Sequence, residues 1–172
     1  MGFVEIIPRQ GAFICDYRRK GTIETLVAIM RFNGGILHPQ ELVSLLEVRK
    51  VLERLCLELV MAHASDDQLQ QLAPLVEGIR SAKTEEDCTE AVYTFHHELA
   101  VLSNNTLLPL LYHSFKPESI QLWASYVRYN SIQSIYAIKL ELYRKILNRD
   151  PSAATQEPGE YWDVHVWQTR KQ

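Results

Sequence analysis

The chain has 172 residues, of which 47% are hydrophobic and 23% are charged, and its formal net charge is −3. This length is enough for one well-buried core, and the composition excludes disordered and fibrous proteins. The slightly acidic balance gives the chain as a whole no electrostatic footprint for nucleic acid. Because the apolar runs are short and no charged-plus-apolar leader opens the sequence, we expect a cytoplasmic protein without a membrane segment.

Two short β-prone runs open the chain, at residues 3–7 and 12–15. Between them lie Pro8, Arg9, Gln10 and Gly11, a sequence typical of a hairpin turn with a basic tip. An isolated hairpin is marginally stable in water, so this one needs support from other structure. A basic stretch follows and is interpreted as an exposed linker.

Helical periodicity governs the chain from about residue 22 onward. Ser65 and Thr84 are predicted N-cap residues, and Asn104 and Asn130 interrupt the pattern. The predicted helices cover residues 22–33, 38–63, 65–82, 84–102, 106–115, 117–129 and 131–148. The predicted fold class is all-α: an antiparallel bundle of about six or seven helices preceded by a short β-hairpin.

Charged side chains interrupt two of the apolar helix faces. On a helical wheel, Arg49 and Glu53 lie in the middle of the apolar arc of residues 41–63, and Lys139 lies at the centre of that of residues 131–148. A buried cation without a partner is costly, so each needs a carboxylate, a bound anion or water. Glu53 can pair with Arg49 one turn away, whereas no acid in its own helix serves Lys139.

Each of these residues also has a purely structural interpretation. Arg49 and Glu53 form, in that interpretation, an ion pair that fixes a helix crossing, and Lys139 extends its ammonium to water. His96 lies on the flank of an apolar face, where a histidine is usually a hydrogen-bonded packing residue. Three tyrosines at near-helical spacing are also typical of a core, namely Tyr126, Tyr136 and Tyr143. The cysteines Cys15, Cys56 and Cys88 lack the paired spacing of zinc or redox motifs and are interpreted as buried thiols.

Three motifs occur in a characteristic order along the chain. Residues 2–14 form the hairpin, residues 45–53 read Leu-Leu-Glu-Val-Arg-Lys-Val-Leu-Glu, and Phe95-His96 precedes Ser103-Asn104-Asn105. In this order they resemble the wing of a winged helix-turn-helix domain and the opening and middle signatures of an all-helical FCD effector-binding domain. The combination resembles the FadR subfamily of the GntR bacterial transcription regulators.

The resemblance implies a regulator that binds operator DNA as a homodimer and responds to a metabolite held in the helical bundle. Residues 1–16 then correspond to a remnant wing, 17–21 to a linker, and 22–172 to the effector-binding and dimerisation domain. Because the chain begins at the wing, we expect a fragment or truncated form whose missing N-terminal domain reads the operator. The wing residues expected to touch DNA are Arg9, Gln10 and Gly11.

Many members of that subfamily hold a divalent metal with an Asp four residues before the Phe-His histidine and two later histidines. Here His96 is retained, whereas Val92, Lys139 and Tyr161 occupy the other three positions. An ammonium near the position of a missing cation supplies positive charge without coordination chemistry. We therefore expect no metal and no cofactor, although His165 would become a second ligand if the tail were shifted by one turn.

The expected function is to sense a small organic acid or an acyl or phosphorylated metabolite, and thereby to control operator binding. Arg49 and Lys139 are expected to be its charge partners and His96 a hydrogen-bond donor. The full set of expected effector-binding residues is Arg49, Glu53, His96, Lys139, Tyr126 and Tyr143.

The alternative is a helical dimerisation or interaction module with a vestigial pocket, whose aromatic tail serves as the interface. That tail contains Tyr161, Trp162 and Trp167. An enzyme is not expected, because the sequence has no HExxH, no Gly-rich phosphate loop and no serine motif.

Overall fold

The computed structural model describes residues 39–155 continuously, together with residues 4–7, 11–14, 16, 19, 21, 22, 24, 25 and 28. The chain divides into two compact units, Met1–Leu37 and His38–Gln172, which are described separately.

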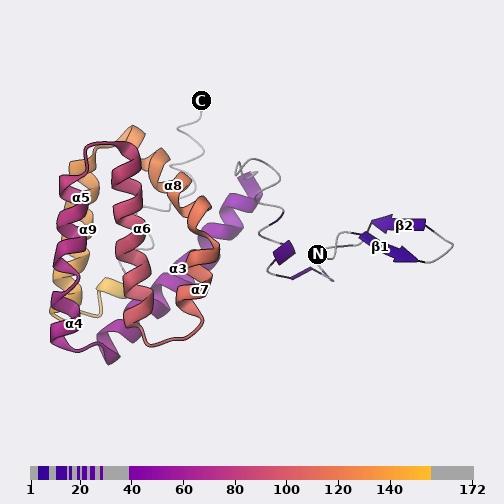
Figure 1. Cartoon of the computed structure of the whole chain (residues 1–172). Helices are drawn as coiled ribbons and strands as arrows, with labels where there is room; N and C mark the ends of the chain where they lie inside the picture. Colours follow the sequence, from indigo (N-terminus) through magenta and orange to yellow (C-terminus); the bar gives the residue numbers. More distant parts are fainter. Residues whose placement is uncertain are drawn as a thin grey trace. The chain divides into compact units, whose positions relative to one another are not determined.

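The N-terminal unit contains a two-stranded antiparallel hairpin (Figure 1). Its strands are β1 (Val4–Ile7) and β2 (Gly11–Ile14), and Val4 lies opposite Ile14. Gly11 has a φ of +108°, a backbone conformation that favours glycine. Residues 8–10, and most of the predicted helix at 22–33, lie outside the described residues. The assignment of this hairpin to a DNA-binding wing, with residues 1–16, 17–21 and 22–172 as successive parts, therefore stays a prediction.

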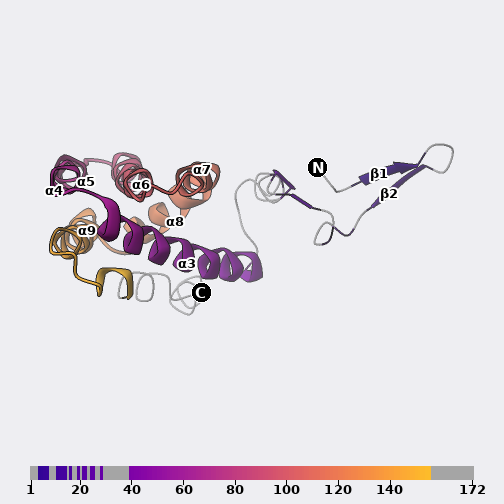
Figure 2. The same ribbon diagram turned by 90° about the horizontal axis from the view of Figure 1, so that it is seen from below.

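Seven α-helices and no strand make up residues 39–155, so the predicted all-α class is confirmed for this part of the chain (Figures 1 and 2). They are α3 (Pro39–His63), α4 (Asp66–Gln70), α5 (Ala73–Ser81), α6 (Glu85–Leu102), α7 (Leu108–Ser114), α8 (Lys116–Tyr129) and α9 (Ile132–Leu147). Within the described ranges, none of the helices has the length and apolar character needed to cross a membrane.

Local hydrogen bonds set several helix boundaries. Ser65 and Gln68 form a reciprocal capping box at the start of α4. Thr84 accepts a hydrogen bond from the backbone N–H of Asp87 at the start of α6, and Ser131 caps α9 in the same way.

The predicted helix at residues 65–82 is instead two helices. α4 ends at Gln70 and α5 begins at Ala73, with Pro74 in its first turn. Proline has no backbone N–H, so Pro74 cannot donate to the carbonyl of Gln70 and the helix cannot continue through it.

The turn between α6 and α7 also follows from its side chains. Asn104 adopts a left-handed conformation with a φ of 59°, which asparagine tolerates better than most residues. The side-chain oxygen of Asn105 accepts hydrogen bonds from the N–H groups of Leu107 and Leu108. These bonds satisfy the first amides of α7, which therefore begins at Leu108 rather than at the predicted residue 106.

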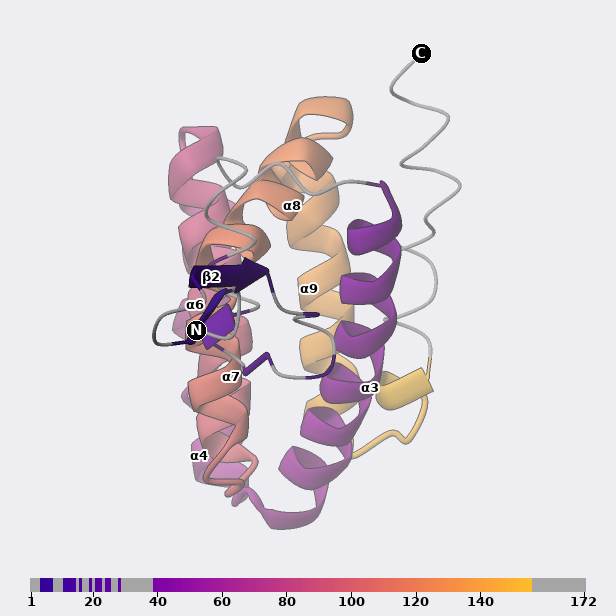
Figure 3. The same ribbon diagram turned by 90° about the vertical axis from the view of Figure 1, so that its right-hand side faces the viewer.

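The core of the C-terminal unit lies where α3, α5, α6, α8 and α9 meet. Figure 3 shows α3 running along the bundle beside α9. Trp123 of α8, Phe95 of α6 and Ile135 of α9 are among the largest fully buried side chains. This packing brings the middle of α3 close to the faces of α6 and α8 that carry the candidate site.

Candidate functional site

Ionisable side chains are buried inside this apolar core. The exposed fractions are 4% for Glu53 and for His96, 3% for Glu118 and 1% for Lys139. The Arg49 side chain is 11% exposed. Removing such groups from water costs several kcal/mol each unless partners compensate, so their contacts define the site.

Arg49 joins α3 to α8, and its contacts include Glu53 on its own helix and Ser119 on α8. Its Nε and Nη2 atoms each lie 3.3 Å from Oε1 of Glu53, one helical turn away. Its Nη1 donates to the hydroxyl of Ser119 at 2.7 Å. The predicted pairing of Arg49 with Glu53 is therefore present, and the long-range bond to Ser119 adds a partner that the sequence analysis did not identify.

His96 contacts the same carboxylate from α6. Its Nδ1 lies 3.5 Å from Oε1 of Glu53. Burial, reinforced by the positive charges of Lys139 and Arg49, lowers the pKa of His96 well below its usual value, so the imidazole is neutral. A carboxylate only accepts hydrogen bonds, so this contact favours the tautomer that carries the proton on Nδ1.

The other ring nitrogen of His96 is left as an acceptor. Nε2 is buried and has no hydrogen-bond partner within the described part of the chain. From the sequence we expected His96 to donate a hydrogen bond to a ligand, and that expectation stays a prediction. The tautomer with its proton on Nδ1 makes Nε2 an acceptor instead, and a ligand hydroxyl or amine is the group that suits it.

Lys139 lies against the ring of Trp123 rather than reaching solvent. Its ammonium nitrogen is 4.5 Å from the centroid of that ring, a cation–π contact that gains strength where water is excluded. The imidazole of His96 stacks on the same indole, with centroids 6.0 Å apart and an interplanar angle of 26°. The interpretation in which Lys139 extends to water is therefore wrong.

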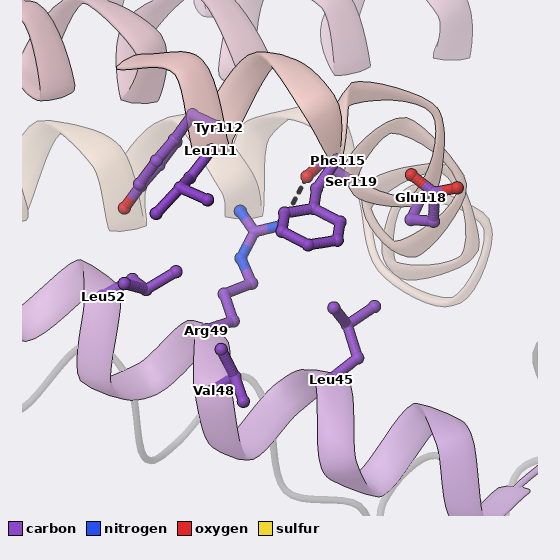
Figure 4. Close-up of a pocket in the computed structure, with 9 residues that line it drawn as sticks. All are labelled: Leu45, Val48, Arg49, Leu52, Leu111, Tyr112, Phe115, Glu118 and Ser119. Atoms are coloured by element: carbon purple, nitrogen blue, oxygen red, sulfur yellow. Dashed lines mark hydrogen bonds between the residues drawn. The ribbon is translucent and has the colours of Figure 1, made fainter. Parts of the chain in front are cut away.

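A small pocket, partly open to solvent, lies between α3 and the junction of α7 with α8 (Figure 4). Arg49 and Ser119 lie at the side of this pocket where α3 faces α8, and most of the remaining wall is apolar. The lining residues are Leu45, Val48, Arg49, Leu52, Leu111, Tyr112, Phe115, Glu118 and Ser119.

The predicted site residues therefore fall into groups. Arg49 and Glu53 form an ion pair, and Nδ1 of His96 lies beside the same carboxylate. Tyr126 joins through Trp123, since their rings meet edge to face at 5.8 Å. Lys139 meets the same indole, whereas Tyr143 lies one turn further along α9, where burial raises its pKa.

Of the predicted DNA-contacting residues, Gly11 begins β2, and Arg9 and Gln10 lie outside the described residues.

The sequence pointed to Tyr126 of α8 but not to Ser119 and Trp123 of the same helix. Ser119, Trp123 and Tyr126 are spaced four and three residues apart and share one face of this helix. A polar serine on the same face as a tryptophan was the signal available, but it became meaningful only once Arg49 was placed opposite it.

The described residues do not fit a divalent metal site. Of the positions implied by the family resemblance, His96 retains a ligand atom, Val92 is apolar, and Lys139 places an ammonium near the imidazole. Tyr161 and His165 lie outside the described residues. Within the described part, no three His, Cys, Asp or Glu side chains are grouped as metal ligands. The expectation of no bound metal stays a prediction.

Two comparisons with known proteins agree with this architecture. The family model described as FCD domain matches residues 44–158, a span that contains nearly all of α3 and every later helix. The solved structure of a Streptococcus agalactiae GntR is similar in fold, with a TM-score of 0.53 and 23% sequence identity. The similarity covers 99% of this chain and 75% of that chain. None of the curated proteins matches the chain.

Proposed function

The chain belongs to the FCD domain family of GntR-type transcription regulators, and we propose that its helical unit senses a small organic acid or an acyl or phosphorylated metabolite. In this proposal the bound metabolite controls operator DNA binding by a winged helix domain. The regulator acts as a homodimer in the cytoplasm, and the hairpin that contains Gly11 acts as a wing, with Arg9 and Gln10 contacting DNA.

Arg49 carries the proposal, because it lines the pocket and also pairs with the buried carboxylate of Glu53. Its partner Ser119 is neutral. A carboxylate or phosphate oxygen that replaced this hydroxyl would form a charge-assisted hydrogen bond, which is roughly twice as strong as a neutral one. The guanidinium thus provides a recognition group for an anion at the wall of the pocket.

Lys139 and His96 supply the deeper part of the proposed site. Lys139 adds a second positive charge beside Trp123, and Nε2 of His96 accepts a hydrogen bond from a ligand hydroxyl. Tyr126 and Tyr143 complete the surroundings on α8 and α9. Arg49 lies on α3, which is the first helix of this unit that the structure describes. A ligand bound to Arg49 therefore acts on the helix that is nearest in sequence to the N-terminal unit.

Replacement of either cation tests this function. Arg49→Met and Lys139→Met should each weaken binding of an acidic ligand about tenfold or more, since each removes a charge-assisted bond worth roughly 1.5–3 kcal/mol. A panel of organic acids and sugar phosphates, screened by thermal unfolding and then by isothermal titration calorimetry, provides the measurement. Arg54→Met is the matched control, because Arg54 lies on the same helix but is 63% exposed.

The outcome also bears on stability. Lys139→Met should keep the fold and even stabilise the ligand-free protein, because it removes a buried charge. If both variants unfold and the wild-type protein gives no hits in the panel, the two cations are structural and the proposed function is wrong.

A helical interaction module with a vestigial pocket is the second candidate. It is favoured by the pairing of Arg49 with Glu53, which already balances the guanidinium without a ligand. The two candidates differ in thermal stabilisation. A ligand at 100 times its dissociation constant adds about 2.7 kcal/mol to the free energy of unfolding, whereas a vestigial pocket adds nothing.

A further inference from the structure

We propose that α7 is a lid on the pocket, which opens while the rest of the helical unit stays folded and which is held shut by a contact between Tyr93 and His113. This inference rests on the proposed function, because the pocket beneath α7 is where that function places the ligand. Its test needs no ligand, so the lid and the proposed function can fail separately.

The closed pocket is too small for an organic metabolite. Its free volume is about 30 Å³, which is room for only a few water molecules. α7 and the residue that follows it contribute Leu111, Tyr112 and Phe115 to the wall that lies opposite α3 (Figure 4). A metabolite therefore needs one wall of the pocket to move before it fits.

Of the helices that line the pocket, α7 has the fewest buried side chains. Leu108 is the one buried residue among the seven of this helix, whereas α8 has five. Leu107 and Leu110 are each 64% exposed. An element that buries little apolar surface opens locally at a small cost in free energy, without unfolding of the whole domain.

Both ends of α7 have joints at which a hinge motion can be absorbed. Before the helix, Asn104 adopts a left-handed conformation with a φ of 59°. After it, Phe115 interrupts the helical path with a φ of −100° and a ψ of 16°, and α8 begins at the next residue. Hinges are a few residues at the ends of elements, as these are. α7 can therefore move as one piece between α6 and α8.

A polar contact holds α7 against α6. Oη of Tyr93 lies 3.2 Å from Nδ1 of His113. The ring of His97 stacks on the Tyr93 ring with centroids 5.6 Å apart, and the ammonium of Lys116 lies 4.7 Å from the centre of the same ring. Neighbours on α6 and α8 thus fix the tyrosine, and His113 is the half of the latch that moves with the lid.

Cys56 of α3 reports the opening of the lid. Its side chain is 2% exposed, and Tyr112 of α7 forms a hydrogen bond with it. Burial raises the pKa of this thiol to about 12, so the covered thiol is unreactive. Cys88, in the first turn of α6, is 0% exposed and belongs to the core cluster. Cys88 therefore becomes reactive only when the helical unit unfolds.

Thiol labelling of the 172-residue chain with iodoacetamide, followed by mass spectrometry of each cysteine peptide, is the test. Cys56 should react about tenfold or more faster than Cys88, because local opening is more frequent than global unfolding. Tyr93→Phe, which removes the hydroxyl of the latch, should speed labelling of Cys56 about three- to tenfold, the effect of one hydrogen bond.

Ile135→Val is the control variant. Ile135 is 0% exposed on α9, so its truncation destabilises the whole unit and should speed labelling of Cys88 about three- to tenfold. It should leave the labelling rate of Cys56 unchanged, because α9 keeps its packing when the lid opens. Equal rates for the two cysteines, or equal acceleration of both by Ile135→Val, would show that Cys56 is exposed by global unfolding and that α7 is no lid. An unchanged Cys56 rate in Tyr93→Phe would overturn the latch.

The results separate this inference from the proposed function. If Cys56 is labelled through local opening but the panel of organic acids and sugar phosphates gives no hits, the lid stands and the proposed function is wrong. If the panel gives a hit that depends on Arg49 while the two cysteines are labelled at equal rates, the proposed function stands and the lid is wrong.

Discussion

His96 is the residue whose chemistry the structure changes most. Its surroundings hold the imidazole neutral, with Nδ1 directed to Glu53 and Nε2 without a hydrogen-bond partner in the described part. An unsatisfied buried acceptor costs about 1–3 kcal/mol, so the native state gives up stability at this atom. Such a cost is typical of sites that a ligand or an ordered water completes.

The neutral state of His96 predicts a pH dependence of stability. Because burial and neighbouring cations lower the pKa of His96 in the folded protein, the unfolded chain takes up a proton below its ordinary pKa of about 6.5 while the folded protein does not. Acid therefore favours unfolding, and this contribution to stability is lost as the pH falls below about 6.5.

Urea unfolding at pH 7, 6 and 5 measures the effect. The free energy of unfolding of the wild-type protein should fall between pH 7 and 5 by up to about 2 kcal/mol more than that of His96→Gln. Equal slopes for the two proteins would mean that His96 takes up its proton equally in the folded and unfolded states, and the acceptor role assigned to Nε2 would fail.

At the scale of elements, Arg149 connects the end of α9 to the end of α3. Its Nη1 donates to the carbonyl of Met61 at 2.6 Å, and its Nη2 donates to the carbonyl of Ala64 at 2.8 Å and to Asp66 at 2.7 Å. The last carbonyls of a helix lack intrahelical partners and carry partial negative charge. A single guanidinium therefore caps α3 and ties it to the first turn of α4.

Loss of this cap should be measurable. Arg149→Gln should lower the free energy of unfolding by about 1–2 kcal/mol, because it removes the charge and its hydrogen bonds to the helix end. Arg54→Gln, which breaks an exposed pair with Glu58 within α3, should change it by no more than about 0.5 kcal/mol. Similar effects of the two variants in chemical denaturation would show that the α3 cap adds nothing beyond an ordinary surface ion pair.

At the scale of the whole molecule, the chain consists of two units with separate structure. Every residue of the described hydrophobic core cluster lies in the second unit, beginning with Leu42 and Leu45 at the edge and Leu46 inside. The helical unit therefore contains its own core, and the charged site lies wholly within it.

This organisation predicts that residues 38–172 fold without the N-terminal unit. Removal of residues 1–37 takes away no member of the described core cluster. The midpoint of thermal unfolding should therefore change by no more than about 4 °C, which corresponds to roughly 1 kcal/mol for a domain of this size. Circular dichroism of the shortened protein provides the measurement, and loss of its helical signal would show that the first 37 residues belong to the bundle.

Short-range features of the fold were predictable from the sequence because their causes are local. The caps predicted at Ser65 and Thr84 are hydrogen bonds within three residues, and the structure has both. The break at Pro74 was equally local and was overlooked.

Burial of Cys56 and Cys88, expected from the sequence, is also confirmed. Burial, reinforced by the charge of Glu53, raises the pKa of the Cys56 thiol to about 12. Cys15 lies outside the described residues.

The sequence by itself determined which charged residues face the interior, because helical periodicity assigns a side chain to a face without reference to any other helix. Arg49, Glu53 and Lys139 were placed in this way, and their burial confirms it. Only the tertiary structure decided what they meet. Ser119, one partner of Arg49, lies 70 residues away on α8, and the ammonium of Lys139 lies over the ring of Trp123. These contacts depend on how each helix is rotated and spaced against its neighbours, which the packing of the whole core sets and no single helix encodes.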